Sequence, residues 1–248
     1  MKHHQATTPT LVAAPLFRRR LHAWFRTSGR DLPWRRTRDP YHILVSELML
    51  QQTQVSRVVD YYARFLERFP TVHDVARARP ARVREAWAGL GYYARARNLH
   101  ALARQVTDRG RADAAAFPTT PAELRTLPGV GAYTAGAVAS FAFERRAALV
   151  DTNVARVLAR VFAPKLDPKS ARDQRQLWAI AERILPRTGR ATWTHNQALM
   201  ELGALVCTAR VARCEVCPVA GVCASASVER VRPKRSAPAH PAPRHRRR

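Results

Sequence analysis

Residues 127–134, with the sequence LPGVGAYT, lie between two stretches whose apolar residues recur at helical spacing. A turn of the form Gly-x-Gly, here Gly129 and Gly131, leaves backbone N–H groups uncovered, and the helix that follows directs its N-terminus outward. Together these groups can hold a phosphate without a charged side chain. The alternative is a tight helix–helix turn that needs glycine only for its backbone angles. On the glycines alone, both interpretations stay open.

The sequence on both sides of this turn predicts helix almost throughout. Apolar residues recur at i, i+4, i+7 and i+8 from Phe17, and at i, i+3, i+4, i+7 and i+8 from Val154. Further helices are expected after Pro40, from 55 to 69, from Pro80 to about 88, and from 94 to 106, with a short turn at 72–78. No stretch alternates like a strand. The 248 residues therefore predict an all-α protein, as one large domain or two sharing a core.

The chain is strongly basic. Lys and Arg total 43 against 18 acidic residues, which gives a net charge of +25. The last 25 residues are rich in Pro and Arg and are expected to form a disordered tail, yet the rest of the chain remains basic without them. No apolar run reaches membrane-spanning length, and no secretory signal is recognised. The charge favours a polyanionic partner, DNA or RNA, and the lack of a long apolar run argues against a membrane-spanning helix.

The four cysteines fall within 17 residues with the spacing C-x6-C-x2-C-x5-C. Disulfides are disfavoured because no secretory segment places the chain in an oxidising compartment. Four thiolates suit zinc, although zinc sites more often pair two C-x2-C units. They also suit a [4Fe–4S] cluster, which the single C-x2-C unit favours. The candidate metal ligands are Cys207, Cys214, Cys217 and Cys223.

Two carboxylates are candidates for acid–base chemistry. Glu47 lies within the apolar run Ile43–Leu50, so a buried carboxyl with a raised pKa is one interpretation. A solvent-facing glutamate is the alternative. Asp151 precedes a helix that starts near Val154, where an N-cap is the common role. The same position would direct a carboxylate into a cleft, where it could stabilise developing positive charge.

Two further segments are unusual for purely structural stretches. Gln51 and Gln52 place amides beside the candidate acid Glu47. The segment Gly89–Leu99 joins Tyr92 and a second tyrosine to arginines after a glycine turn. Aromatic side chains beside cations can wedge into a base stack and grip the flanking phosphates. The flanking Leu-Pro and Tyr-Thr of the 127–134 turn likewise favour a helix-hairpin-helix clamp on a DNA backbone.

Taken together, residues 16–223 resemble the helix-hairpin-helix DNA glycosylases, and most closely the MutY-type adenine-DNA glycosylases. The motifs that carry the resemblance occur in the order typical of that family. They are RDLPWR (30–35), DPY (39–41), SELMLQQTQV (46–55), GLGYYARARNL (89–99), the 127–134 turn, VDTNV (150–154), NQALMELG (196–203) and the four cysteines.

The resemblance implies a role for each matching residue. Glu47 would protonate adenine at N7, and Asp151 would stabilise an oxocarbenium-like sugar, as paired carboxylates do in glycoside hydrolysis. Tyr133 and Asn153 would support this pair. Gln51 and Tyr92 would fill or wedge the stack around the space that the flipped base vacates. The pocket for that base would be lined by Arg30, Trp34, Arg35, Leu50, Gln52 and Glu201.

The resemblance also implies that the cysteines hold a [4Fe–4S] cluster and that the enzyme is monofunctional. Endonuclease III-like relatives carry a lysine where this chain has Tyr133, and that amine forms the Schiff base needed to cut the strand. Without it, an abasic site is the expected product. Two departures from the adenine enzymes concern specificity. No second domain that reads 8-oxoguanine follows the cysteines, and position 152 is Thr where Gly is common.

The predicted organisation is two-lobed, with the cleft between the lobes. A helical barrel lobe (38–148) contains the helix-hairpin-helix (about 120–140), and residues 16–37 with 149–224 form a cluster lobe. A flexible N-terminus (1–15) and a disordered basic tail (225–248) flank them. The expected substrate is double-stranded DNA with adenine opposite 8-oxoguanine or guanine, bound by a monomer in the cytoplasm at the nucleoid. Two alternatives are a glycosylase for thymine or uracil opposite guanine and a non-catalytic mismatch-binding protein.

Overall fold

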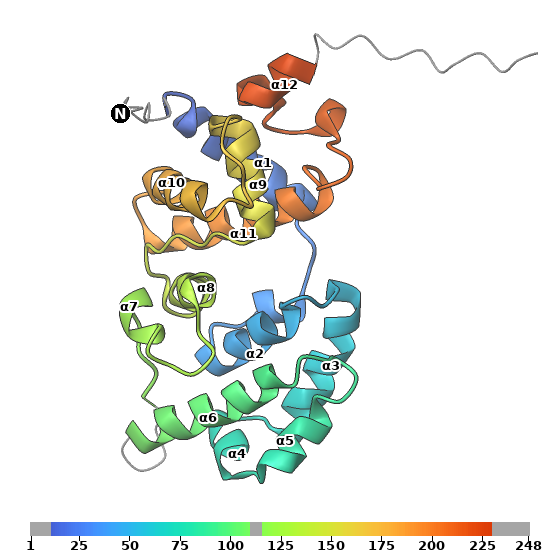
Figure 1. Cartoon of the computed structure of the whole chain (residues 1–248), viewed down its shortest axis with the longest axis vertical. Coiled ribbons are helices and arrows are strands. Elements are labelled where there is room, and N and C mark those ends of the chain that lie inside the picture. The colour runs from blue at the N-terminus through green and yellow to red at the C-terminus, as the bar shows by residue number, and fades with distance from the viewer. Residues whose placement is uncertain (1–10, 110–115, 230–248) are drawn as a thin grey trace, which may run out of the picture.

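The computed structural model describes residues 11–109 and 116–229, and within these ranges it is helical, with no named strand (Figure 1). This confirms the predicted all-α class. The helices are α1 (Ala14–Ser28), α2 (Pro40–Leu50), α3 (Val55–Arg68), α4 (Val72–Arg77), α5 (Pro80–Ala86), α6 (Ala94–Arg109), α7 (Pro121–Leu124), α8 (Ala132–Phe143), α9 (Thr152–Phe162), α10 (Ala171–Arg183), α11 (Gly189–Leu205) and α12 (Ala224–Glu229).

The helices form two groups. Helices α2 to α8 pack together, with α4 against α6 and α2 against α8, while α1, α9, α10, α11 and α12 form a second group in which α11 packs against both α1 and α9 (Figure 1). Helix α8 also packs against α11, so the two groups share a boundary. Segments 29–39 and 144–151 connect them, so the first and the last described helices, α1 and α12, belong to the same group.

Helix α2 is buried on every side. Each residue from Ile43 to Met49 is almost inaccessible to solvent, and most are aliphatic. The helix begins where the Asp39 carboxylate accepts hydrogen bonds from the amides of Tyr41 (2.7 Å) and His42, with Pro40 at the first helical position. Proline there costs no hydrogen bond because that N–H has no intrahelical partner. A helix without a solvent face forces its one carboxylate, Glu47, into the interior.

The structure differs from the predicted elements at three places. Residues 72–77 form a helix rather than a turn, because Thr71 and Asp74 make a reciprocal capping box. Helix α1 begins at Ala14 and Leu11 packs on the core, so helix and core packing begin within the stretch 1–15 that is predicted to be a flexible N-terminus. Helix α12 (Ala224–Glu229) likewise covers the first residues of the stretch 225–248 that is predicted to be a tail. Residues 1–10 and 230–248 lie outside the described ranges.

Within the described ranges, every helix is too short or too polar to cross a membrane.

Candidate active site

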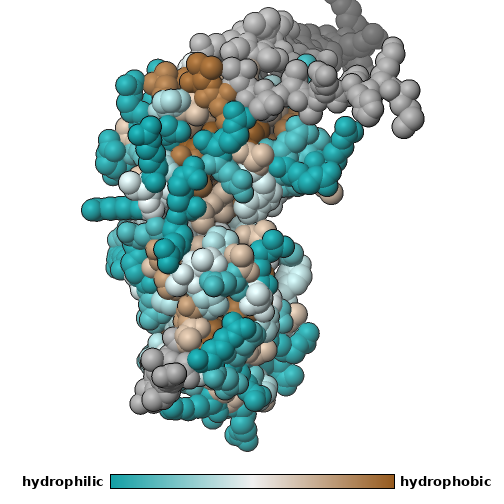
Figure 2. Space-filling view, turned by 90° about the vertical axis from the view of Figure 1, so that its left-hand side faces the viewer, coloured by the Kyte–Doolittle hydropathy of each residue, from teal (hydrophilic) through white to brown (hydrophobic). Residues whose placement is uncertain are grey.

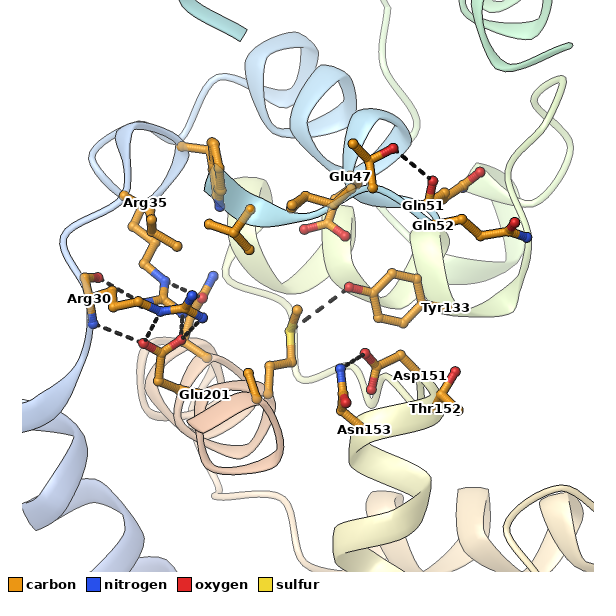
Figure 3. A pocket seen from close by; sticks show the side chains of 18 residues that line it. Arg30, Arg35, Glu47, Gln51, Gln52, Tyr133, Asp151, Thr152, Asn153 and Glu201 are labelled. Atoms are coloured by element: carbon orange, nitrogen blue, oxygen red, sulfur yellow. Dashed lines mark hydrogen bonds and ion pairs between the residues drawn. The ribbon is translucent and has the colours of Figure 1, made fainter. Parts of the chain in front are cut away.

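A cavity of about 560 Å³ opens at the boundary between the two helix groups (Figure 3). Its walls come from the 30–35 segment, the end of α2 with the loop that follows, the starts of α8 and α9, and one face of α11. The lining residues are Arg30, Leu32, Trp34, Arg35, Glu47, Leu50, Gln51, Gln52, Thr53, Val55, Tyr133, Asp151, Thr152, Asn153, Gln197, Met200, Glu201 and Ala204.

Glu47 is the buried acid of this cavity. Its side chain extends from the last turns of α2 toward Tyr133 (Figure 3), and only 3% of the residue is exposed. Burial raises the pKa of Glu47 to about 7, and the charge of Asp151 acts in the same direction, while the Tyr133 hydroxyl and Arg35 oppose the shift. Its Oε2 is buried without a hydrogen-bond partner. The carboxyl is therefore poised to give up a proton near neutral pH.

Asp151 fills the N-cap position of α9 and faces the cavity. Its carboxylate accepts hydrogen bonds from the backbone N–H of Val154 (2.6 Å) and from Nδ2 of Asn153 (3.2 Å). Burial raises the pKa of Asp151, and these hydrogen bonds oppose the shift. The N-cap and the cleft-facing carboxylate, which the sequence presents as alternatives, are thus one arrangement.

Asn153 is itself fixed from behind. Its Oδ1 accepts a hydrogen bond from Nη2 of Arg156 (2.8 Å), and the same guanidinium donates to the carbonyl of Cys207 (2.8 Å). Arg156 therefore connects the Asn153 side chain, which contacts Asp151, to Cys207 in the cysteine loop.

Tyr133 lies between the two carboxylates. It is the second residue of α8, and its hydroxyl donates to Sδ of Met200 at 3.9 Å (Figure 3). Burial and the charges of Glu47 and Asp151 raise its pKa well above the ordinary tyrosine value, so the phenol stays protonated. A protonated phenol can donate a hydrogen bond to either carboxylate, whereas it has no amine with which to form a Schiff base.

The opposite wall carries a buried charge network. Glu201 is 1% exposed and accepts from the backbone N–H (3.0 Å), Nε (2.7 Å) and Nη2 (2.9 Å) of Arg30 and from Nη2 of Arg35 (2.8 Å). Burial alone would raise the pKa of Glu201, but these hydrogen bonds outweigh it and lower the pKa to about 2. A carboxylate has about four acceptor positions, so Glu201 is saturated and fixes the two arginines.

The apolar part of the cavity comes from Trp34 and Leu50. Trp34 is buried and packs edge-on against Tyr62, with ring centroids 5.5 Å apart. Gln51 and Gln52 lie at the rim in the loop after α2 (Figure 3). Gln52 has a φ of +58°, a backbone conformation that side-chain-bearing residues rarely adopt, so its position is imposed by the surrounding contacts.

Gly129 and Gly131 lie outside the cavity and play different roles. Gly129 has a φ of +76°, and an added Cβ would lie 2.6–2.9 Å from side-chain atoms of Asn98. Gly131 has ordinary angles as the N-cap of α8, with open space where a Cβ would stand. Position 129 therefore requires glycine for its backbone conformation, as in a tight helix–helix turn. The open start of α8 at Gly131 fits the phosphate explanation.

Tyr92 also lies outside the cavity and is 62% exposed, with a φ of +46°. Its exposure fits a wedge. Arg95 is one of the arginines of the Gly89–Leu99 segment, for which a grip on phosphates is predicted; it is only 6% exposed, so this prediction is wrong for Arg95. Its guanidinium is directed into the protein, where backbone carbonyls surround it.

The four cysteines line one small cavity between α9, the end of α11 and the 207–223 loop. Burial raises the pKa of the Cys217 thiol, and the nearby Cys207 and Cys223 act in the same direction. Nη1 of Arg160 donates to Sγ of Cys207 at 3.3 Å. In the described ranges, no group of three or more His, Cys, Asp or Glu side chains is arranged to hold a single metal ion.

Comparison with known proteins agrees with this geometry. Residues 45–183, more than half of the chain, match the model of the HhH-GPD superfamily of base excision DNA repair proteins. The chain belongs to this superfamily.

An HhH-GPD relative, the adenine DNA glycosylase of Rattus norvegicus, is 44% identical over 216 residues, which are 84% of this chain and 41% of that protein. The chain thus spans about two fifths of the length of this curated relative. A thermostable thymine-DNA glycosylase superposes with a TM-score of 0.76 at 31% identity, covering 87% of this chain and 97% of that one. A trapped covalent intermediate of endonuclease III with DNA superposes with a TM-score of 0.70 at 25% identity, covering 88% and 99%.

Sequence reasoning missed three cavity residues that lie on α11, namely Gln197, Met200 and Ala204. Gln197 is 4% exposed and accepts a hydrogen bond from Nε of Arg35 (2.8 Å), and Met200 contacts Tyr133. The 196–203 motif and the residue after it carry the signal, because positions 197, 200, 201 and 204 share one face of a helix and all line the cavity. Recognising Glu201 as a site residue identifies the rest of that face.

Proposed function

We propose that this protein is a monofunctional DNA glycosylase that hydrolyses the N-glycosidic bond of adenine mispaired with 8-oxoguanine or guanine and leaves an abasic site. The observation that carries the proposal is a buried carboxyl, Glu47, with a pKa of about 7, in a 560 Å³ cavity that also holds Asp151. The similarity to adenine DNA glycosylases over 84% of the chain supports adenine as the base.

The proposed chemistry uses the two carboxylates in opposite protonation states. Glu47 is the general acid: its proton moves to a ring nitrogen of the flipped adenine, and the electron pair of the C1′–N bond leaves with the base. The sugar then carries positive charge, which the Asp151 carboxylate stabilises until water adds at C1′ and gives up a proton to the Glu47 carboxylate, which restores the acid. Asn153 and the Val154 amide keep Asp151 in place. The protonated Tyr133 phenol can donate a hydrogen bond to the Glu47 carboxylate once that group has lost its proton.

The remaining cavity residues would recognise the base. Trp34 and Leu50 supply apolar surface, while Arg30 and Arg35 present guanidinium groups that Glu201 fixes. Gln52 would line the pocket for the flipped base. Gln51 and the exposed Tyr92 would fill the space in the DNA stack that the adenine leaves, since extrusion has to be offset by new stacking. The start of α8 at Gly131 would bind a backbone phosphate. The net charge of +25 predicts steep salt dependence of binding to double-stranded DNA.

A [4Fe–4S] cluster is the proposed occupant of the cysteine cavity. Four thiols border it, and Arg156 and Arg160 supply positive charge that favours thiolates. In such a cluster each thiolate binds a different iron, so the ligands need not converge on one ion as zinc requires. The bound cluster would cross-link the 207–223 loop, which contacts α9 through these arginines. Its role here is structural.

A panel of duplexes tests the proposal. Duplexes with 8-oxoguanine:adenine, guanine:adenine, guanine:thymine and guanine:uracil would be incubated with the protein and then treated with alkali. We expect cleavage of the adenine strand, only after alkali. Glu47→Gln should abolish base release while duplex binding persists. Equal release by wild type and Glu47→Gln would refute the acid assignment, and strand cleavage without alkali would refute monofunctional action.

One observation favours a second candidate, a thymine- or uracil-releasing mismatch glycosylase. A thermostable thymine-DNA glycosylase superposes on this chain with a TM-score of 0.76 at 31% identity. In the same panel this candidate predicts release only from guanine:thymine or guanine:uracil. The cavity and the two carboxylates would then serve a pyrimidine.

A further inference from the structure

Arg95, at the start of α6, is a buried cation without a counterion. The residue is 6% exposed, and within residues 11–109 and 116–229 no carboxylate forms an ion pair with it. A charged side chain in the interior is costly unless its donors are satisfied. Among the described residues Nε of Arg95 has no hydrogen-bond partner, whereas Nη1 and Nη2 are both bonded, so the partners of these two nitrogens show what the burial of Arg95 achieves.

The guanidinium donates to two loops at once. Nη1 donates to the carbonyls of Leu48 (2.9 Å), Met49 (2.9 Å) and Gln51 (2.5 Å), at the end of α2 and in the loop that follows. Nη2 donates to the carbonyls of Leu90 (3.0 Å) and Gly91 (3.1 Å) in the glycine loop. These two segments are some 40 residues apart in the chain, and one planar group joins them.

The Arg95 guanidinium also contacts one aromatic ring in the core and one at the surface. Its Cζ lies 5.6 Å from the ring centroid of the fully buried Trp87 and 5.6 Å from that of the exposed Tyr92. A guanidinium can stack on aromatic faces while its edge donates hydrogen bonds. Tyr92 is thus held against a cation that is itself anchored on the core.

Both loops contain strained backbone. Gln52 has a φ of +58° and Tyr92 a φ of +46°, and each lies within three residues of a carbonyl that Arg95 binds. Such conformations cost free energy and persist only where surrounding contacts over-determine them. Arg95 binds carbonyls next to both residues, and Nη2 of Arg57 donates in addition to the carbonyl of Gly89 in the glycine loop.

We propose that Arg95 is a positioning residue that couples the 50–54 loop to the 89–93 loop, so that Gln52 and Tyr92 meet DNA as one preformed unit. The part of this inference that concerns DNA rests on the proposed function. The coupling of the loops does not, and it can be measured in the free protein. A lysine cannot replace the arginine, because three donors on one nitrogen do not span five carbonyls on two loops.

The first test is hydrogen exchange of the free protein, read by mass spectrometry for peptides covering 48–54, 89–95 and 132–143. Arg95→Met keeps an unbranched apolar stem without donors, Arg95→Lys keeps the charge, and Arg104→Met changes an exposed arginine on the same helix. We expect exchange in both loop peptides to rise by about tenfold or more in Arg95→Met, with 132–143 unchanged and Arg104→Met like wild type. Arg95→Lys should fall between. A rise in one loop only, or in neither, overturns the coupling.

The second test separates positioning from chemistry. Single-turnover adenine release would be measured on a duplex with adenine opposite 8-oxoguanine and on one with adenine opposite an abasic-site analogue, where the base is already unpaired. Arg95→Met should slow the first at least tenfold more than the second, because only the first requires extrusion of a paired base. Equal losses overturn the positioning role. If wild type releases adenine from neither duplex, the proposed function fails, and hydrogen exchange still decides the coupling.

Discussion

Removing the Glu201 carboxylate should destabilise the protein by about 3–5 kcal/mol, a range that follows from its pKa and from the cost of breaking a buried ion pair. Its pKa of about 2, against an ordinary 4.5, corresponds to about 3 kcal/mol of stability at neutral pH, at about 1.4 kcal/mol per pKa unit. Breaking a buried ion pair by deleting one partner costs about 3–5 kcal/mol. Loss of the carboxylate would leave the Arg35 guanidinium buried without its ion-pair partner, because only 9% of this side chain is exposed.

The assay is thermal unfolding of wild type, Glu201→Gln and Glu67→Gln, an exposed glutamate that serves as the matched control. For a domain of this size about 3–5 kcal/mol corresponds to a fall in Tm of about 6–20 °C. Because the pKa of Glu201 is lower in the folded than in the unfolded protein, its carboxylate stabilises the fold at every pH above the unfolded-state pKa of 4.5. The contribution is lost as the pH falls toward 2, so the gap between wild type and Glu201→Gln should narrow over that range.

Two results would refute this reasoning. A Tm for Glu201→Gln that matches Glu67→Gln at pH 7 would mean that water replaces the carboxylate at no cost. A gap that persists unchanged at pH 3 would mean that the loss comes from packing rather than charge. Either result would remove the argument that Glu201 fixes Arg30 and Arg35 in the cavity.

Three further predictions follow from other parts of the structure. The single-turnover rate should fall about tenfold for each pH unit above 7, because Glu47 must carry its proton to act as an acid. The rate should also fall at acidic pH, where Asp151 becomes protonated and loses its charge. A pH-independent rate on the 8-oxoguanine:adenine duplex would contradict the acid role of Glu47. Gly129→Ala should lower the free energy of unfolding by about 1–3 kcal/mol in urea titrations, because the positive φ and Asn98 leave no room for Cβ, whereas Gly131→Ala should change it little. Cys217→Ser should lose the broad visible absorbance expected of a [4Fe–4S] protein; a colourless wild type that contains zinc would contradict the cluster.

Much of the candidate site could be predicted because its residues carry the chemistry themselves. Glu47 stands alone in an apolar run, and only burial of that helix remained to be seen. Asp151 could be predicted as a cap, but its second function depends on where α9 begins relative to α2, which no local pattern encodes.

The residues that sequence reasoning misjudged are those whose role is decided by tertiary contacts. Arg95 follows two tyrosines and looks like a surface cation, yet its partners lie some 40 residues away. Met200 looks like a core residue of α11, and its contact with Tyr133 exists only because α8 packs on that helix. Short-range patterns locate chemistry, whereas long-range packing decides which side chains support it.

The start of α8 has a consequence for how the protein would register along a DNA strand. Gly131 caps this helix and Tyr133 stands two residues further on, inside the cavity, so both are parts of one rigid element. In the proposed complex, the distance from the bound phosphate to the reacting sugar is then set by a single helical turn. The position of the bound phosphate would therefore determine which nucleotide reaches Glu47. Lengthening the turn by one residue would shift that choice along the strand without touching either carboxylate.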